Sequence, residues 1–212
     1  MIVIVGTAHV INLEDRIEEI LKNEMPEAVC VELDIYRYIA LKHSDGENYS
    51  PSKTFQKLAE FQRKIAEILA APLGGDMLAA VEKAREIGAD VHFIDKDIRE
   101  IAQKIGEISL REKLKIFAGV ILGRKVKSKE DVKDFLKEVS ENAESVLEEF
   151  RKSFPSLAKI LIDEREDYMV SRVIELRNKY QKIVVFVGEA HAKSMGEKLR
   201  GKGEDVKIIH LI

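Results

Sequence analysis

The chain has 212 residues, enough for one domain with a sizeable core or for one domain that carries a helical insertion. Its composition, 45% hydrophobic and 34% charged, is that of a globular protein with a densely charged surface. A net charge of −3 and the absence of Trp argue against a nucleic-acid-binding surface, because such surfaces are usually basic and use aromatic stacking. The sequence therefore predicts no nucleic-acid partner.

The sequence shows neither a disulfide nor an export signal. Its single cysteine, Cys30, excludes an intramolecular disulfide. No segment near residue 2 resembles a signal peptide, and no apolar run approaches the roughly 18 residues that cross a bilayer. These features favour a location in the cytoplasm or at the cytoplasmic face of a membrane. The abundance of Glu, Lys and Arg is compatible with a thermophilic source.

The N-terminal part predicts two parallel strands. The β-branched run 2–5 ends at Gly6 and is typical of a fully buried strand. Apolar positions at helical spacing predict a helix over 12–23, which Met25-Pro26 ends, and 28–33 predicts a second strand. A strand, a helix and a strand in this order form a right-handed crossover, so the two strands should be parallel.

Helical patterns dominate the middle of the chain. A polar segment with Gly and Pro predicts a loop, and it is followed by two helices and a third strand, over 43–54, about 54–70, about 76–87 and 89–95. Strand patterns return only near the C-terminus, where a strand, a helix and a last strand are predicted over 183–188, about 193–200 and 206–212. The sequence predicts one α/β domain over 1–212. It has a mostly parallel sheet of about five strands flanked by helices, with a helical insertion or cap over about 97–180 between strands three and four.

Polar side chains follow four of the predicted strands. In open α/β sheets, ligands bind beyond the carboxyl ends of the strands. The imidazoles and carboxylates at such positions are His9, Glu32, Asp34, Asp95, Asp97 and His191. Each has an ordinary explanation, since charged groups at a sheet edge are mostly exposed and an Asp before a helix commonly caps it.

One motif occurs twice, almost a full chain length apart. An apolar run, a glycine, two residues and a histidine appear as Gly6 to His9 and again as Gly188 to His191. Glycine allows a sharp turn and brings the backbone close to a bound group, so Gly6 and Gly188 are candidate cofactor-binding positions. A single histidine after a strand is often only a cap or turn residue. The repetition favours the hypothesis that the two histidines are halves of one site.

Such a site suits a divalent metal ion. Imidazoles combined with carboxylates are common ligands of Zn²⁺, Mn²⁺, Co²⁺ and Fe²⁺, and the candidate ligands are His9, His191, Glu32 and Asp95. A metal with an open position would activate a water molecule, and a nearby carboxylate could accept its proton. Without a metal, a His–Glu pair could still perform acid–base chemistry.

A further carboxylate and arginine lie on the helix predicted after Pro155. Apolar residues at Leu157 and Leu161 define an inward stripe, and Glu164 falls on it with Arg165 at its edge. A buried carboxylate needs a partner, so one interpretation is an internal salt bridge. The other is that this helix covers the site and contributes Glu164 or Arg165 to catalysis.

Taken together, these segments resemble the TraB/PrgY family, whose animal relatives include the TIKI metalloproteases. The family also looks related to ChaN and erythromycin-esterase-like proteins. The resemblance rests on GTAHV, VELDIYR, GGDMLAAVEKAREIGADVHFIDKDI, DEREDYM and VGEAH, at 6–10, 31–37, 74–98, 163–169 and 187–191. It implies that His9 and His191 are the motif histidines, Glu32 the accompanying acid and Arg37 the family's arginine.

The resemblance implies metal-dependent peptide hydrolysis, with Mn²⁺ or Co²⁺ rather than Zn²⁺. The TraB/PrgY branch is associated with shutting down peptide pheromones, by cleavage or sequestration. Prokaryotic members commonly carry a C-terminal membrane region, and this sequence has none, which suggests a portion of a longer protein. The sequence leaves the oligomeric state open, a homodimer included.

Three functional hypotheses follow. The first is a metal-dependent hydrolase acting on peptides, in which Arg37 and Arg165 hold a substrate carboxylate or a developing oxyanion. The second is a protein that binds and sequesters a peptide without cleaving it. The third is a metal-free hydrolase of the esterase type, acting on a small molecule or peptide.

Overall fold

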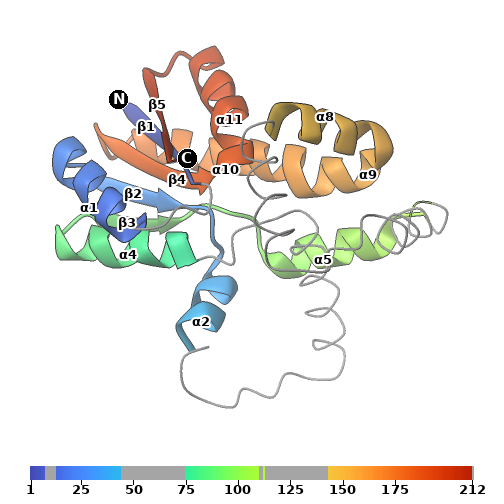
Figure 1. Cartoon of the computed structure of the whole chain (residues 1–212), viewed down its shortest axis with the longest axis horizontal. Coiled ribbons are helices and arrows are strands. Elements are labelled where there is room, and N and C mark those ends of the chain that lie inside the picture. Colours follow the sequence, from blue (N-terminus) through green and yellow to red (C-terminus); the bar gives the residue numbers. More distant parts are fainter. Residues whose placement is uncertain (8–12, 44–74, 110–111, 113–142, 212) are drawn as a thin grey trace, which may run out of the picture. The chain divides into compact units, whose positions relative to one another are not determined.

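The computed structural model describes residues 1–7, 13–43, 75–109, 112 and 143–211 (Figure 1). Five strands in these ranges form one parallel sheet, in the order β3-β2-β4-β1-β5. They are β1 (Ile2–Thr7), β2 (Ala28–Val31), β3 (Asp90–Phe93), β4 (Ile183–Gly188) and β5 (Val206–Leu211). The structure therefore confirms the predicted α/β class and its parallel, helix-flanked sheet.

The chain divides into two compact units. The described residues of the first are 1–7, 13–43, 75–98 and 164–211, and those of the second are 99–109, 112 and 143–163. Besides the sheet, the first unit contains α1 (Leu13–Glu24), α2 (Ile35–His43), α4 (Gly75–Glu86), α10 (Glu164–Arg177) and α11 (Glu189–Gly201). None of the helices in these described ranges is long and apolar enough to cross a membrane.

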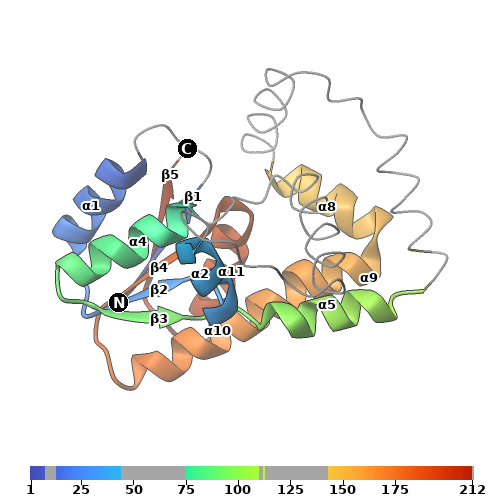
Figure 2. The same ribbon diagram turned by 90° about the horizontal axis from the view of Figure 1, so that it is seen from below.

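Helices cover both faces of the sheet, which explains why its strands read as continuous apolar runs (Figures 1 and 2). Successive residues of a strand point to opposite faces. Ile2 and Ile4 of β1 pack in one cluster with residues of α10 and α11. Val3 and Val5 pack in another cluster with residues of α1 and α4, two helices that lie side by side in Figure 2.

The second unit is helical in its described part. It contains α5 (Ile98–Glu107) apart from its first residue, α8 (Ala143–Ser153), α9 (Pro155–Ala158) and the π-helical turn η1 (Lys159–Asp163). Ile101, Ile105 and Leu157 form an apolar cluster there. Glu112 Oε1 accepts the backbone N–H of Ser156 at 3.0 Å, which satisfies a free donor at the start of α9.

The structure differs from the sequence-based expectation at two helix starts. Asp34 caps a helix that the pattern analysis does not predict, α2, by accepting the backbone N–H of Tyr36 at 2.8 Å and of Arg37 at 3.1 Å. Helix α11 begins at Glu189, directly after β4, instead of near 193. The predicted loop beyond His43 and the predicted helix over about 54–70 lie outside the described residues.

Candidate functional site

The carboxyl ends of β1, β2 and β4 meet at one edge of the sheet. Thr7 pairs with Gly188 at the ends of the neighbouring strands β1 and β4. The Glu32 N–H, just after β2, donates to Phe186 O of β4 at 3.0 Å. Gly188, the first residue of the second motif, therefore lies between Thr7 at the end of β1 and Glu32 just after β2.

His191 connects two carboxylates at this edge. It lies in the first turn of α11 and is 6% exposed. Its Nδ1 is 3.1 Å from Glu166 Oε1, and its Nε2 is 3.5 Å from Glu32 Oε1. The prediction that His191 and Glu32 approach each other agrees with this geometry. His9, the other motif histidine, lies outside the described residues.

Glu166 is a fully buried carboxylate that the sequence analysis missed. Besides His191, it accepts a hydrogen bond from Ser194 Oγ at 2.6 Å, and Lys198 Nζ lies 3.1 Å from it. Burial alone would raise the pKa of Glu166, but the contacts with His191, Ser194 and Lys198 lower it below its ordinary value. Glu166 is therefore held as an anion next to His191.

A π-helical turn explains why helical spacing predicts Glu164 instead. Continued at α-helical spacing, the inward stripe of Leu157 and Leu161 reaches Glu164, but η1 (Lys159–Asp163) has more residues per turn. The phase therefore changes before α10, where Glu166 is buried. Glu164 is partly exposed, and its Oε2 lies 3.4 Å from Lys96 Nζ.

Glu32 is held from both sides. Its Oε2 accepts the Gly188 backbone N–H at 2.7 Å, and its Oε1 accepts a hydrogen bond from Arg165 Nη2 at 2.5 Å. The side chain of Glu32 is 11% exposed and that of Arg165 is 13% exposed, so this ion pair is largely shielded from water. Glu32 and Arg165, both predicted site residues, are thus in direct contact.

Asp95 lies at the centre of an ion-pair chain. It accepts from Arg165 Nε at 3.0 Å and Nη2 at 2.5 Å, and also from Arg37 Nη2. Arg37 Nε in turn donates to Asp34 at 2.6 Å. Burial would raise the pKa of Asp95, but the two guanidinium groups hold it well below its usual range. Both predicted arginines are therefore bound to carboxylates.

The two motif glycines differ in their surroundings. A Cβ atom on Gly6 would lie 2.2 Å from Glu189 Oε2 and 3.0 Å from Ala192 Cβ, so it would displace the Glu189 carboxylate and crowd α11. A Cβ atom on Gly188 would lie 3.5 Å from Glu32 Oε2, an ordinary contact. Gly6 thus permits close packing of α11, whereas Gly188 contributes its N–H to Glu32.

This difference predicts unequal effects of two matched substitutions. Gly6→Ala should lower the free energy of unfolding by about 1–3 kcal/mol, because an added methyl group in a packed site forces neighbours to shift. Gly188→Ala should cost less than about 1 kcal/mol, mainly through its position before the helix. Urea denaturation of both variants measures the difference, and equal losses would contradict this packing assignment.

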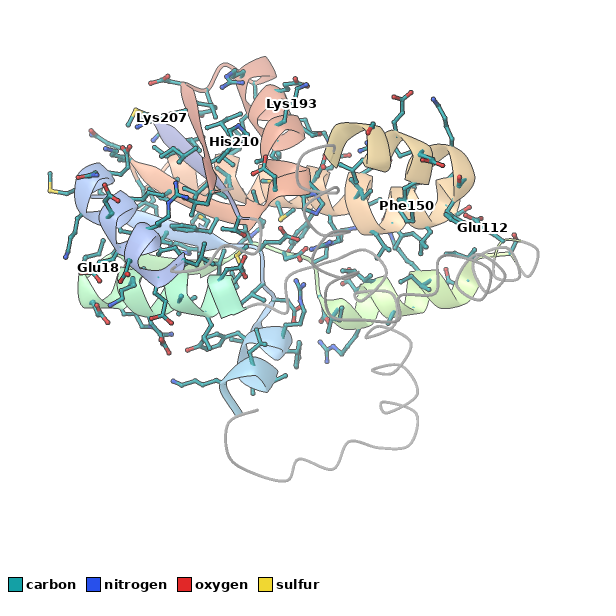
Figure 3. All side chains as sticks on the ribbon, in the orientation of Figure 1. Glu18, Glu112, Phe150, Lys193, Lys207 and His210 are labelled. Carbon is teal, nitrogen blue, oxygen red and sulfur yellow. The ribbon has the colours of Figure 1, made fainter. Side chains whose placement is uncertain are left out.

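Two more polar contacts at this edge were not predicted. His210 Nδ1 lies 2.6 Å from Glu189 Oε1, and Figure 3 labels His210 on β5 near α11. Only the register of β5, which pairs His210 with Gly6, reveals this contact.

The second contact joins Thr7 and Asp76. The Thr7 hydroxyl donates a hydrogen bond to Asp76, and burial raises the pKa of the Asp76 carboxyl group. Asp76 is in the GGDMLAA segment, but its spacing gave no separate indication.

Three of the four predicted metal ligands, Glu32, Asp95 and His191, lie in the described residues. Among the described residues, no group of three His, Cys, Asp or Glu side chains is arranged to hold a metal ion. Glu32 and His191 provide two neighbouring donors. Both carboxylate oxygens of Asp95, also a predicted ligand, accept hydrogen bonds from arginine.

The lowered pKa of Glu166 predicts a pH-dependent stability. A carboxyl group with a lower pKa in the folded state stabilises the fold above its unfolded-state pKa, and this contribution is lost as the pH falls through the folded-state pKa. The free energy of unfolding should therefore decrease below about pH 4.3, the ordinary pKa of Glu.

Urea denaturation between pH 3 and 7 tests this expectation. Glu166→Gln should show a flatter pH dependence than the wild type in the acidic range. Glu197→Gln is the control for the loss of one negative charge, because Glu197 is exposed and lies on α11, the helix that contacts Glu166 through His191 and Ser194. Parallel curves for the wild type and Glu166→Gln would show that Glu166 does not supply this stability.

Comparison with known proteins identifies the family of the chain. The family model described as TraB/PrgY/gumN matches residues 1–207 of the chain. The chain is also 27% identical over 229 residues to the uncharacterized protein MJ1365 of Methanocaldococcus jannaschii, an alignment that covers the whole chain. It covers 57% of the relative, so the chain spans little more than half the length of the curated relative it matches. Both glycine–histidine motifs lie inside the matched range.

Proposed function

Because the chain belongs to the TraB/PrgY/gumN family, we propose that it is a metal-dependent hydrolase that acts on peptides. The observation that carries this proposal is the distance of 3.5 Å between Glu32 Oε1 and His191 Nε2. Two ligands that each lie about 2.1 Å from an ion at a tetrahedral angle are roughly 3.4 Å apart. The spacing of these two donors therefore suits a shared ion.

The partner of His191 also supports a metal-binding role. A histidine that binds a metal usually donates its other ring N–H to a carboxylate, which fixes the tautomer and the ring orientation. Glu166, buried and ionised, occupies that place at Nδ1. The lone pair of Nε2 then faces Glu32.

His9 is the proposed third ligand. It follows Thr7 by two residues, and Thr7 pairs with Gly188 next to the candidate donors. Two residues of extended chain span at most about 7 Å, so a ligand two positions after Thr7 is within reach of this edge. This proposal would also explain the repeated motif, because its two copies begin on the neighbouring parallel strands β1 and β4.

The chemistry of the proposed site divides among several residues. A divalent ion, when bound, supplies a Lewis acid that polarises a carbonyl group and acidifies a water molecule. Glu32 and the two motif histidines would hold it, and Glu166 orients His191. The family resemblance is the reason for proposing Mn²⁺ or Co²⁺ instead of Zn²⁺, and for proposing a peptide as the substrate. Shutdown of a peptide pheromone, and a place in the cytoplasm or at the cytoplasmic face of a membrane, belong to the same proposal.

A peptide-cleavage assay tests the proposal. The protein is stripped with a chelator, reloaded with Mn²⁺ or Co²⁺ and incubated with a mixed peptide library, and the products are read by mass spectrometry. We expect cleavage by the reloaded wild type, and at least a 100-fold loss both after chelation and in Glu32→Ala. Glu189→Gln, which keeps an acceptor for His210, is the matched control for a carboxylate at the same edge of the sheet.

The two other hypotheses predict different results in this assay. Peptide binding without cleavage under any metal condition would favour the sequestering protein. Turnover of peptides or esters that survives complete removal of metal would favour the metal-free hydrolase. Either result would overturn the metal-dependent mechanism while leaving the family assignment intact.

A further inference from the structure

We propose that Asp95 is a positioning residue, which acts on Glu32 through the guanidinium group of Arg165. This inference rests on the proposed function, because the ion whose binding it influences is the proposed metal at Glu32. Asp95 would neither bind the ion nor touch the substrate. Its role is to fix Arg165, and thereby to fix both the orientation of Glu32 and the negative charge that remains there.

The acceptor positions of Asp95 are fully used. Its side chain is 0% exposed. Oδ1 accepts from Arg165 Nε at 3.0 Å and from the Lys96 backbone N–H at 2.7 Å. Oδ2 accepts from Arg165 Nη2 at 2.5 Å and from Arg37 Nη2. A carboxylate offers about four acceptor positions, so these four donors leave none for a metal ion.

Arg165 transmits the position of Asp95 to Glu32. Its Nε and Nη2 bind the two oxygens of Asp95, a bidentate contact that fixes the plane of the guanidinium group. The second hydrogen of Nη2 is then directed at Glu32 Oε1, 2.5 Å away. Because the guanidinium fork is rigid, its contact with Asp95 determines where it meets Glu32.

The charges in this chain explain the consequence for a bound cation. Glu32, Asp34 and Asp95 carry three negative charges, and Arg37 and Arg165 carry two positive charges, so one negative charge remains. If the charge of Asp95 is removed, the remaining charges of the ion-pair chain sum to zero. Of the two acids that share Arg165, only Glu32 is then charged. A cation beside Glu32 should then bind less tightly.

A double-mutant cycle read out by Mn²⁺ binding separates positioning from direct ligation. Asp95→Asn should weaken Mn²⁺ binding about 10–100-fold, as is usual for residues that support a metal ligand. In the Arg165→Met background, the same Asp95→Asn change should have a much smaller effect on Mn²⁺ affinity, because only its direct charge effect remains. Asp90→Asn, at the opposite end of β3, is the matched control and should leave the affinity unchanged. An equal loss from Asp95→Asn in both backgrounds would overturn the proposal, since it would identify a direct ligand.

A second cycle does not depend on any metal. Ionised Asp95 and Glu32 can only repel each other directly, so a favourable coupling between them must pass through Arg165. The shifts in urea midpoint caused by Asp95→Asn and Glu32→Gln should show this favourable coupling with Arg165 present and lose it in Arg165→Met. Additive shifts in both backgrounds would contradict the positioning role. If Mn²⁺ does not bind the wild type but the shifts are coupled, the proposed function fails and the positioning role of Asp95 stands.

Discussion

Replacing His191 with Ala is expected to abolish the stabilisation that Mn²⁺ gives the wild-type protein. A ligand at 100 times its dissociation constant stabilises the folded state by about 2.7 kcal/mol. For a chain of this size, that corresponds to a rise in melting temperature of about 5–10 °C. The alanine variant loses one donor and also leaves Glu166 without its imidazole partner, so the rise should disappear.

A thermal scan with and without Mn²⁺ measures this effect. His92→Ala is the matched control, because His92 is on β3 and its Nε2 lies 3.0 Å from the Tyr180 hydroxyl instead of a proposed ligand. It should lower the melting temperature without Mn²⁺ but keep the Mn²⁺-dependent rise. An undiminished rise in His191→Ala would place the ion elsewhere.

Replacing Arg165 with Met is expected to give a large loss of folding stability. The change leaves Glu32 and buried Asp95 without the cation that they share. Removing one partner of a buried ion pair typically costs 3–5 kcal/mol, since an uncompensated charge stays buried. We therefore expect the free energy of unfolding at pH 7 to fall by about 3–5 kcal/mol in urea denaturation.

Two comparisons show whether the buried charge is the cause. Arg172→Met removes a more exposed arginine of the same helix, paired with Glu175, and should cost at most about 1 kcal/mol. Adding Asp95→Asn to Arg165→Met should recover part of the lost stability, because it removes a buried charge that keeps only one of its two arginine partners. A loss for Arg165→Met no larger than that for Arg172→Met would contradict the burial argument.

Much of the sheet could be predicted because strands that are buried on both faces have continuous apolar sequences. The apolar runs around Val3, Val29 and Val185 could form only fully covered strands, and parallel order follows from the helices between them. Helix α2 was missed because its apolar positions give a weak pattern. The capping acid Asp34, two residues before Tyr36, is the signal that could have found it.

Apart from Arg37 and Arg165, the residues of the candidate site could be predicted where they closely follow strands. Glu32, Asp95 and His191 meet that condition, and the structure brings all three into one chain of contacts through Arg165. Glu166 escaped prediction because a π-helical turn changes the helix phase, which spacing rules do not encode.

His210 escaped prediction for a different reason. Its partner Glu189 is 21 positions earlier in the chain, and only the pairing of β5 with β1 brings the two elements together. Likewise, the sharing of Arg165 between two acids depends on three elements that are distant in sequence. Contacts of this kind require the sheet order, which one sequence does not specify.

The most direct test of the proposed site is a crystal structure of the protein soaked with Mn²⁺, with the ion located by its anomalous scattering. We expect one strong peak within about 2.0–2.3 Å of both Glu32 and His191 Nε2, with His9 as a further ligand and Asp95 still bound to Arg165. An ion found only at other residues, or no peak at saturating Mn²⁺, would contradict the metal site on which the proposed function depends.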